Sequence, residues 1–148
     1  MLDDPDLKIL RTLQQNGRTK RNELAELVGL SVPSVSERLK KLEENQVIEG
    51  YYTKVNRQAF GYDILAFILV VMDSSKHYKD LIKHVEKHPN ILECYSVLGE
   101  GSHLLKVTVK NTESLEKLLS EIQTWLGVTS TKTTYVLSTI KETTSINI

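Results

Sequence analysis

Residues 23–44 read ELAELVGLSVPSVSERLKKLEE, and this stretch decides the first half of the fold. Its first part belongs to a helix over about Arg21–Val28, which Gly29 ends because glycine tolerates the left-handed conformation that follows a helix. Ser31 is a typical N-cap and Pro33 is tolerated in a first turn, so another helix starts there. Two short helices joined by this tight turn predict a helix-turn-helix.

The residues on either side complete a unit within the first 60 residues. Asp4-Pro5 predicts the start of a preceding helix, with Asp4 as its cap, because Asp is a typical N-cap and Pro suits a first helical turn. Asn16-Gly17 predicts its end, because Gly suits a helix C-terminus. After the helix-turn-helix come residues typical of one or two short strands, namely Val47, Ile48, Tyr51, Tyr52 and Val55.

The rest of the chain alternates between strand and helix periodicity. We expect a buried strand, a helix, two strands, a second helix and a Thr-rich strand, over Leu65–Met72, Tyr78–His88, Ile91–Leu98, His103–Val109, about 112–122 and Thr131–Ile140. The order β-α-β-β-α-β predicts a ferredoxin-like α+β domain. Neither half alone buries much surface, so we also expect a homo-oligomer that covers the open face of the sheet.

Composition restricts the class of protein. The chain has 148 residues, of which 40% are apolar, with 19 basic and 19 acidic residues, so it is globular and has no overall basic coat. The single cysteine, Cys94, excludes an intrachain disulfide and a cysteine zinc cluster. The N-terminus does not resemble a signal peptide, and the longest apolar run, Ile64–Met72, is far below the roughly 20 residues of a membrane span. We expect a cytoplasmic protein that does not contact membranes.

Positive charge gathers around the helix-turn-helix. Residues 18–41 hold six basic and three acidic side chains, a local excess typical of a surface that contacts phosphates. Polar residues of the third helix are candidates to enter a major groove. The DNA-binding candidates are Arg18, Lys20, Arg21, Ser31, Ser34, Ser36, Glu37, Arg38, Lys40 and Lys41. The alternative is a three-helix packing unit with a solvated charged face.

Several motifs in this order closely resemble the Lrp/AsnC family of transcriptional regulators. They are Asp3-x-x-Asp6 with Ile9-Leu10 and Leu13, Asn16-Gly17-Arg18, Glu23-Leu24-Ala25-x-x-Val28-Gly29-Leu30-Ser31, Val35-x-x-Arg38-Leu39-x-x-Leu42-Glu43 and Val47-Ile48-x-Gly50-Tyr51. The resemblance implies a winged helix-turn-helix over 1–56, a hinge over 57–64, and a ferredoxin-like ligand-sensing and oligomerisation domain over 65–148. It also implies a non-enzyme whose partners are double-stranded DNA, an amino-acid effector and copies of itself, as a dimer that assembles to an octamer.

Two residues depart from the family pattern. Lys20 stands where a small or hydroxyl residue is common, so the second helix lacks its side-chain cap. Gln46 stands where the family has a glycine, so Asn45 or Gln46 must form that turn. Neither departure threatens the fold.

The resemblance assigns roles to the candidate DNA contacts. Ser31–Lys41 becomes the recognition helix, with Ser34, Ser36 and Glu37 near base edges. Lys40 and Lys41 would touch phosphates, and Arg38 would do so or be structural. Lys54 and Arg57 would reach flanking phosphates, or form a solvated strand end.

The segment Val97–Val107 resembles the effector loop of the family, usually written V-x-G-x-x-D-x-x-L-K-V. Gly99 and Gly101 would let backbone N–H groups approach a carboxylate. Ser102, next to His103, stands where amino-acid-sensing members have an aspartate, so Glu100 becomes the candidate acid. Weaker effector candidates on the last strand are Thr131, Thr133 and Thr134. The alternative is a plain β-turn between two strands.

The other patterns in the sequence favour neither a metal site nor a cofactor site. His84 and His88 are four residues apart on a helix but lack a third ligand, so we expect no metal and no cofactor. Gly99-x-Gly101 does not continue into a dinucleotide fingerprint. The leading hypothesis is therefore a DNA-binding regulator. The alternatives are an architectural DNA-wrapping protein, a small-molecule-binding module that no longer binds DNA, and an enzyme that needs a metal at His84 and His88.

Overall fold

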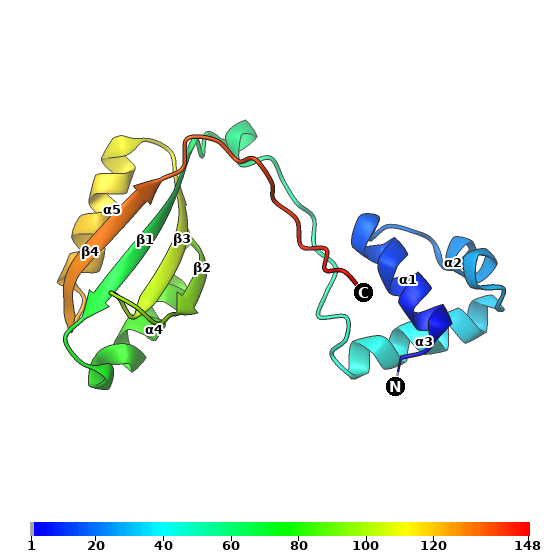
Figure 1. Ribbon diagram of the computed structural model, residues 1–148. Helices are drawn as coiled ribbons and strands as arrows, with labels where there is room; N and C mark the ends of the chain where they lie inside the picture. The colour runs from blue at the N-terminus through cyan, green and yellow to red at the C-terminus, as the bar shows by residue number, and fades with distance from the viewer. Residues whose placement is uncertain (1) are drawn as a thin grey trace. The chain divides into compact units, whose positions relative to one another are not determined.

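The computed structural model describes residues 2–148, which form two compact units. The first unit holds the chain up to Lys54 together with Lys141–Ile148, and the second holds Val55–Ile140. Figure 1 shows helices in the first unit and a sheet with helices in the second.

The first unit consists of three helices: α1 (Asp4–Gln15), α2 (Arg21–Val28) and α3 (Val32–Glu44). Their apolar faces meet in one core, made of Ile9, Leu24, Ala25, Val35 and Leu39. The predicted helix-turn-helix is confirmed, with α2, the turn at Gly29 and α3 in sequence.

The ends of these helices follow the capping chemistry of the sequence. Gly29 is left-handed, with φ of 67°, and the Ser31 hydroxyl accepts the Ser34 N–H at 3.3 Å. Lys20 supplies no side-chain cap, as expected, and its own N–H is bound by the Glu23 carboxylate at 2.9 Å. The cap of α1 is Asp3, one residue before the predicted Asp4.

The strands predicted around Val47–Val55 are wrong, because within residues 2–148 every strand lies in the second unit. Gln46 takes a left-handed conformation, with φ of 56°, and turns the chain back onto α3. The N–H groups of Val47 and Ile48 then both donate to the Leu42 carbonyl, at 2.9 and 3.1 Å. These amides close the end of α3, so they cannot form a ladder with another strand.

The last eight residues pack on α1 and so group with the first unit, whereas the family resemblance implies that they belong to the second domain. The Gln14 side chain pairs with the backbone of Ile146, accepting its N–H at 2.7 Å and donating to its carbonyl at 3.1 Å. Arg11 donates to the Ile148 carbonyl at 2.7 Å. Polar side chains on α1 thus hold this C-terminal segment.

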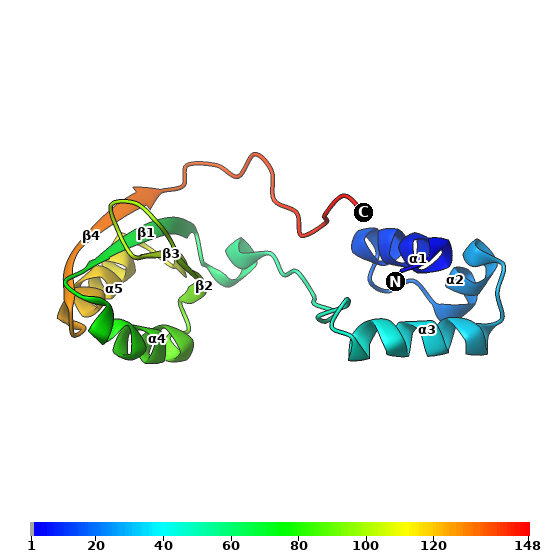
Figure 2. The ribbon, with the colours of Figure 1, turned by 60° about the horizontal axis from the view of Figure 1, so that its bottom comes forward.

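The second unit is a four-stranded antiparallel sheet of order β2-β3-β1-β4, with β1 (Ile64–Met72), β2 (Ile91–Ser96), β3 (His103–Val109) and β4 (Val128–Tyr135). Helices α4 (Tyr78–Lys87) and α5 (Thr112–Thr124) lie on the same side of it (Figure 2). This arrangement confirms the predicted ferredoxin-like α+β domain.

The two faces of the sheet differ. Alternate β1 residues, among them Ile68 and Val70, are fully buried against Leu81 of α4, Ile122 of α5 and Trp125. Phe67, Leu69 and Val71 alternate with them and stay only half-buried, on the face turned away from both helices, here called the open face.

Strand β4 begins three residues earlier and ends five residues earlier than predicted. Its pairing with β1 ends where Tyr135 faces Ala66, and the Val136 N–H makes the last bond, to Leu65. The Thr-rich alternation continues beyond that point, but it has no strand to pair with.

Candidate functional site

Helix α3 has a buried face and an exposed face. Val35, Leu39 and Leu42 are buried at helical spacing, whereas Glu37, Lys40 and Lys41 are exposed on the other side. The partly exposed Ser34 and Ser36 lie at the two flanks. Charged side chains flanked by serines therefore line the part of α3 that is free to approach a ligand.

The exposed face of α3 is not strongly positive. Lys41 pairs with Glu37 at 2.8 Å and Lys40 with Glu44 at 3.6 Å. The hydrogen bond from Lys41 lowers the pKa of Glu37, and that carboxylate raises the pKa of Lys41. Residues 2–54 hold nine basic and nine acidic side chains, so any attraction to phosphates depends on where the charges lie.

Unpaired positive charge lies at the beginning of α2. Arg18, Lys20 and Arg21 are exposed, and none forms an ion pair with another residue of the described 2–148. Three cations within four residues, next to the exposed face of α3, are well suited to bind phosphate oxygens.

The other predicted phosphate contacts are engaged elsewhere. Lys54 forms an ion pair with Glu142, and Arg57 donates to the Tyr62 carbonyl of its own segment. Arg38 binds Asp3 and Asp6 at the start of α1, with its Nη1 2.8 Å from each carboxylate. Sequence reasoning could not find these partners, because most of them are distant along the chain.

The predicted effector loop, residues 99–102, packs tightly on β1. The Ser102 N–H donates to the Val70 carbonyl at 2.9 Å, and the Val97 N–H donates to the Ser102 carbonyl at 2.9 Å. A Cβ on Gly101 would lie 2.6 Å from Leu69 Cγ and 2.9 Å from the Val70 oxygen. Gly101 therefore allows close packing within the chain, in addition to any role toward a ligand.

His103 lies on the helix side of the sheet. It is 4% exposed, its ring meets Tyr78 edge-on at 4.8 Å, and its Nδ1 lies 2.8 Å from the Ser102 hydroxyl. Burial lowers the pKa of His103, so its neutral form is favoured.

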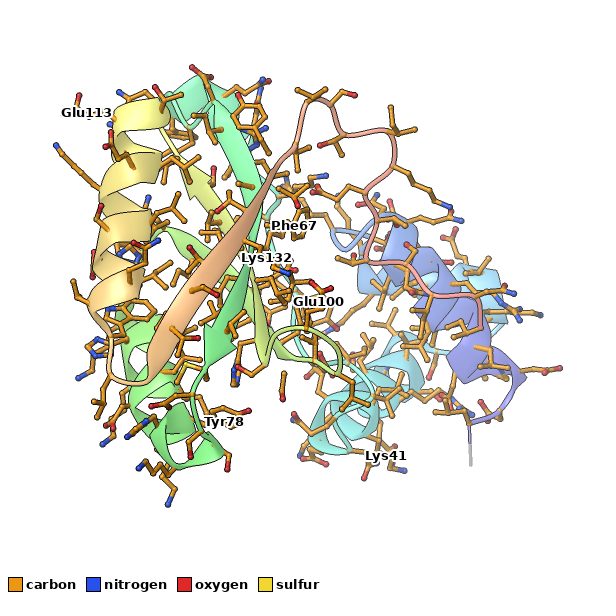
Figure 3. All side chains as sticks on the ribbon, turned by 60° about the vertical axis from the view of Figure 1, so that its left-hand side comes forward. Lys41, Phe67, Tyr78, Glu100, Glu113 and Lys132 are labelled. Atoms are coloured by element: carbon orange, nitrogen blue, oxygen red, sulfur yellow. The ribbon has the colours of Figure 1, made fainter. Side chains whose placement is uncertain are left out.

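Glu100 lies on the other side, where it forms an ion pair with Lys132 of β4 (Figure 3). Both side chains are more than half exposed, and the Lys132 hydrogen bond lowers the pKa of Glu100. Lys132 pairs in register with Leu69, so it lies on the open face. Sequence reasoning missed Lys132, although it is the one charged residue in β4.

The three threonine candidates cannot line one pocket together. Thr134 faces Phe67 in the ladder and shares the open face, whereas Thr131 and Thr133 face Val70 and Ile68 and point to the helix side. The structure therefore brings together Glu100, Lys132 and Thr134, and it separates Thr133 and His103 from them.

The histidine pair on α4 packs against Trp125. His84 stacks on the indole with ring centroids 4.8 Å apart, and His88 lies 3.3 Å from the Glu121 carboxylate. Within residues 2–148, no group of three His, Cys, Asp or Glu side chains is placed to hold a metal ion. A helix long and apolar enough to cross a membrane is also absent from this range.

Comparisons with known proteins agree for both units. Residues 2–49 match the family described as winged helix-turn-helix DNA-binding, and residues 65–146 match the Lrp/AsnC ligand binding domain. The chain is 37% identical to the HTH-type transcriptional regulator FL11 of Pyrococcus furiosus, over 99% of this chain and 96% of that protein.

Solved structures give the same result. A transcriptional regulator of Neisseria meningitidis in complex with L-Met has a TM-score of 0.93 at 32% identity, covering 99% of this chain and 97% of that one. The feast or famine regulatory protein of Mycobacterium tuberculosis, complexed with L-methionine, has a TM-score of 0.91 at 34% identity and covers 99% of both chains. This chain belongs to the Lrp/AsnC family of DNA-binding transcriptional regulators.

Proposed function

We propose that this regulator binds duplex DNA as a homo-oligomer and that an amino acid or a related small molecule changes this binding. The DNA contacts would be the exposed face of α3 for bases and Arg18, Lys20 and Arg21 for phosphates. The observation that carries the assignment is the group of three unpaired cations at the start of α2, beside a recognition helix whose own lysines are paired within the helix.

Polar side chains on α3 are suited to base edges. Ser34, Ser36 and Glu37 are short or acidic and can accept from bases, and Ser can also donate. Selection of bound duplexes from a random library, followed by sequencing, tests this assignment. Enrichment of a motif supports base readout, and Glu37→Gln is expected to change the preferred base at one position. Lack of any enriched motif would instead favour an architectural DNA-wrapping protein.

A second copy is expected to cover the open face. Phe67, Leu69 and Val71 leave apolar surface half-exposed there, and burial of such surface stabilises association. One helix-turn-helix per chain also favours a dimer, because two recognition helices can read half-sites about one DNA turn apart. We further propose that dimers assemble to an octamer.

The proposed effector site is the open-face end of the loop at Glu100. An α-amino acid carries one ammonium and one carboxylate, and Glu100 and Lys132 offer the opposite charges side by side. Two related structures contain L-methionine, which supports an amino acid as the class of effector. The Ser102 hydroxyl is neutral and lies against Val70 and His103, whereas the Glu100 carboxylate is charged and exposed, so Glu100 is the better candidate to receive the ammonium.

The effector proposal is tested by thermal unfolding with each of the twenty amino acids, beginning with L-methionine. We expect at least one to raise the unfolding temperature of the wild type and to have a smaller effect on Glu100→Gln. Glu113→Gln is the matched control, because Glu113 is an equally exposed glutamate paired with a lysine, on α5 (Figure 3). An effector that stabilises Glu100→Gln as strongly as the wild type would place the site elsewhere.

A further inference from the structure

Arg38 is the one basic residue of α3 that reaches across to another helix. Its Nη1 lies 2.8 Å from both carboxylate oxygens of Asp3 and from Oδ1 of Asp6. The side chains of Asp6 and Arg38 are only 14% and 28% exposed, whereas those of Lys40 and Lys41 are 73% and 66% exposed. Arg38 therefore occupies an environment that the other α3 cations do not share.

The two carboxylates are themselves fixed. Asp3 accepts the Asp6 N–H at 3.0 Å, and Asp6 accepts the Asp3 N–H at 3.3 Å, in a reciprocal cap of α1. The Asp6 N–H, and after it the Arg38 guanidinium, hold the pKa of Asp3 below its ordinary value. Arg38 thus binds a preorganised end of α1.

The position of this ion pair in the unit matters for α3. Arg38 directly precedes Leu39 and lies one turn after Val35, so it borders the apolar contact of α3 with Ile9. It also lies on the same flank of α3 as Ser34 and Lys41, four residues before and three residues after it. A rotation of α3 against α1 would displace both of these candidate DNA contacts.

The charge of the cluster argues against a phosphate contact. Two carboxylates and one guanidinium sum to a net charge of about −1, which repels a phosphate. The bonds to Asp3 and Asp6 all use Nη1, so a phosphate at the other N–H groups of Arg38 would still face two carboxylates. If the guanidinium moved away to bind a phosphate, a poorly exposed carboxylate would lose its partner.

We propose that Arg38 is a positioning residue, which locks the recognition helix α3 to the start of α1 through Asp3 and Asp6 and thereby sets base discrimination. This inference rests on the proposed DNA-binding role of α3. Base contacts require donor–acceptor distances of roughly 2.7–3.2 Å, so small shifts of α3 reduce discrimination. Attraction to phosphates, which is less demanding geometrically, is retained.

The experiment compares two probes on the full chain: a duplex enriched by the wild type from a random library, and an unselected random duplex. Arg38→Gln and Asp6→Asn are each expected to lower the ratio of the two affinities by roughly tenfold, and the double variant by no more than either, as for coupled residues. Asp4→Asn is the matched control, since it removes one exposed acidic charge from the same turn. Its ratio should remain that of the wild type.

Two measurements separate positioning from phosphate contact. One is the direction in which Asp6→Asn changes the affinity, and the other is the salt slope of Arg38→Gln. For positioning, Arg38→Gln keeps the wild-type slope of log K against log salt on random duplex, whereas Arg21→Gln flattens it by about 0.9. Arg38→Lys is expected to restore part of the ratio and serves in place of Arg38→Gln if that variant does not fold.

Three results have distinct meanings. Arg38 is a phosphate ligand, and the inference fails, if Arg38→Gln flattens the slope by about 0.9 and Asp6→Asn binds as tightly as the wild type or more tightly. The inference also fails if every variant keeps the wild-type ratio of the two affinities, because the ion pair would then have no effect on base discrimination. Failure of the wild type to enrich any duplex counts against the proposed base readout instead.

Discussion

At the scale of single residues, Gly101 shows how a glycine in the proposed effector loop can be required for packing within the chain. Gly101→Ala is expected to destabilise the protein by about 1–3 kcal/mol, because its Cβ would overlap Leu69 and the Val70 carbonyl. Gly17→Ala is the control, since a Cβ there meets only the Leu13 oxygen, at 3.9 Å. Urea unfolding of both variants measures the difference, and equal stabilities would contradict this account of the loop.

His103 predicts a pH dependence of stability. Its pKa is lowered in the folded protein, so below its usual value of 6.5 the unfolded chain takes up a proton more readily than the folded one. Folding stability contributed by the neutral ring is complete above pH 6.5 and is lost as the pH falls toward the folded pKa. We expect urea unfolding to show a larger loss between about pH 7.5 and pH 5.5 for the wild type than for His103→Asn.

The comparison with His103→Asn isolates this residue, because the other histidines are common to both proteins. Asparagine retains a polar atom near the Ser102 hydroxyl, so a change in overall stability is kept small. Parallel pH profiles for the two proteins would show that His103 is not the titrating group.

Interactions between residues that are close in sequence were predictable, whereas pairings between residues that are distant in sequence were not. The sequence predicted the Ser31 cap and the Gly29 turn because each depends on neighbours within four residues. The pairs of Arg38 with Asp3 and of Glu100 with Lys132 each span more than thirty residues, so only the folded chain brings them together.

At the scale of secondary structure, the C-terminal segment 141–148 depends on α1. Gln14→Ala is expected to release this segment, because it removes both hydrogen bonds to the Ile146 backbone. Amide hydrogen exchange at Ile146 should accelerate to the rate of an unprotected amide. Gln15→Ala, one exposed residue further along α1, should leave the rate unchanged. Slow exchange in Gln14→Ala would mean that other contacts hold the segment.

Prediction of the elements succeeded where local signals agreed with tertiary pairing. Periodicity and capping located all five α-helices of the described chain, and the alternation in His103–Val109 gave β3 with its observed bounds. The strands expected in Val47–Val55 do not form, because the N–H groups of Val47 and Ile48 bond to the Leu42 carbonyl. The predicted bounds of β4 are wrong, because the extent of β1, not local propensity, decides where pairing stops.

At the scale of the whole molecule, the open face predicts association. The wild type is expected to sediment at twice the chain mass of 16.8 kDa or a higher multiple. Phe67→Glu should shift this toward the monomer, because it places a charge on the half-buried open face. Ile82→Glu is the control, since Ile82 is an exposed apolar residue on α4. A wild type that sediments as a monomer at micromolar concentration would contradict the proposed oligomer.

Because the molecule has no net charge, its attraction to DNA must depend on where its cations lie. With equal numbers of basic and acidic residues, only a localised group of cations can attract phosphates. Arg18, Lys20 and Arg21 form such a group in the first unit, without an ion-pair partner among residues 2–148.

The most direct test of the central claim is a salt titration of full-length protein binding to random duplex DNA. We expect binding that weakens linearly in log K against log salt, with a slope that Arg18→Ala combined with Arg21→Ala flattens by about 1.8. Lys79→Ala with Lys83→Ala removes the same charge from α4 and should keep the wild-type slope. Absence of wild-type binding at low salt, or an unchanged slope in the Arg18 and Arg21 variant, would contradict the account.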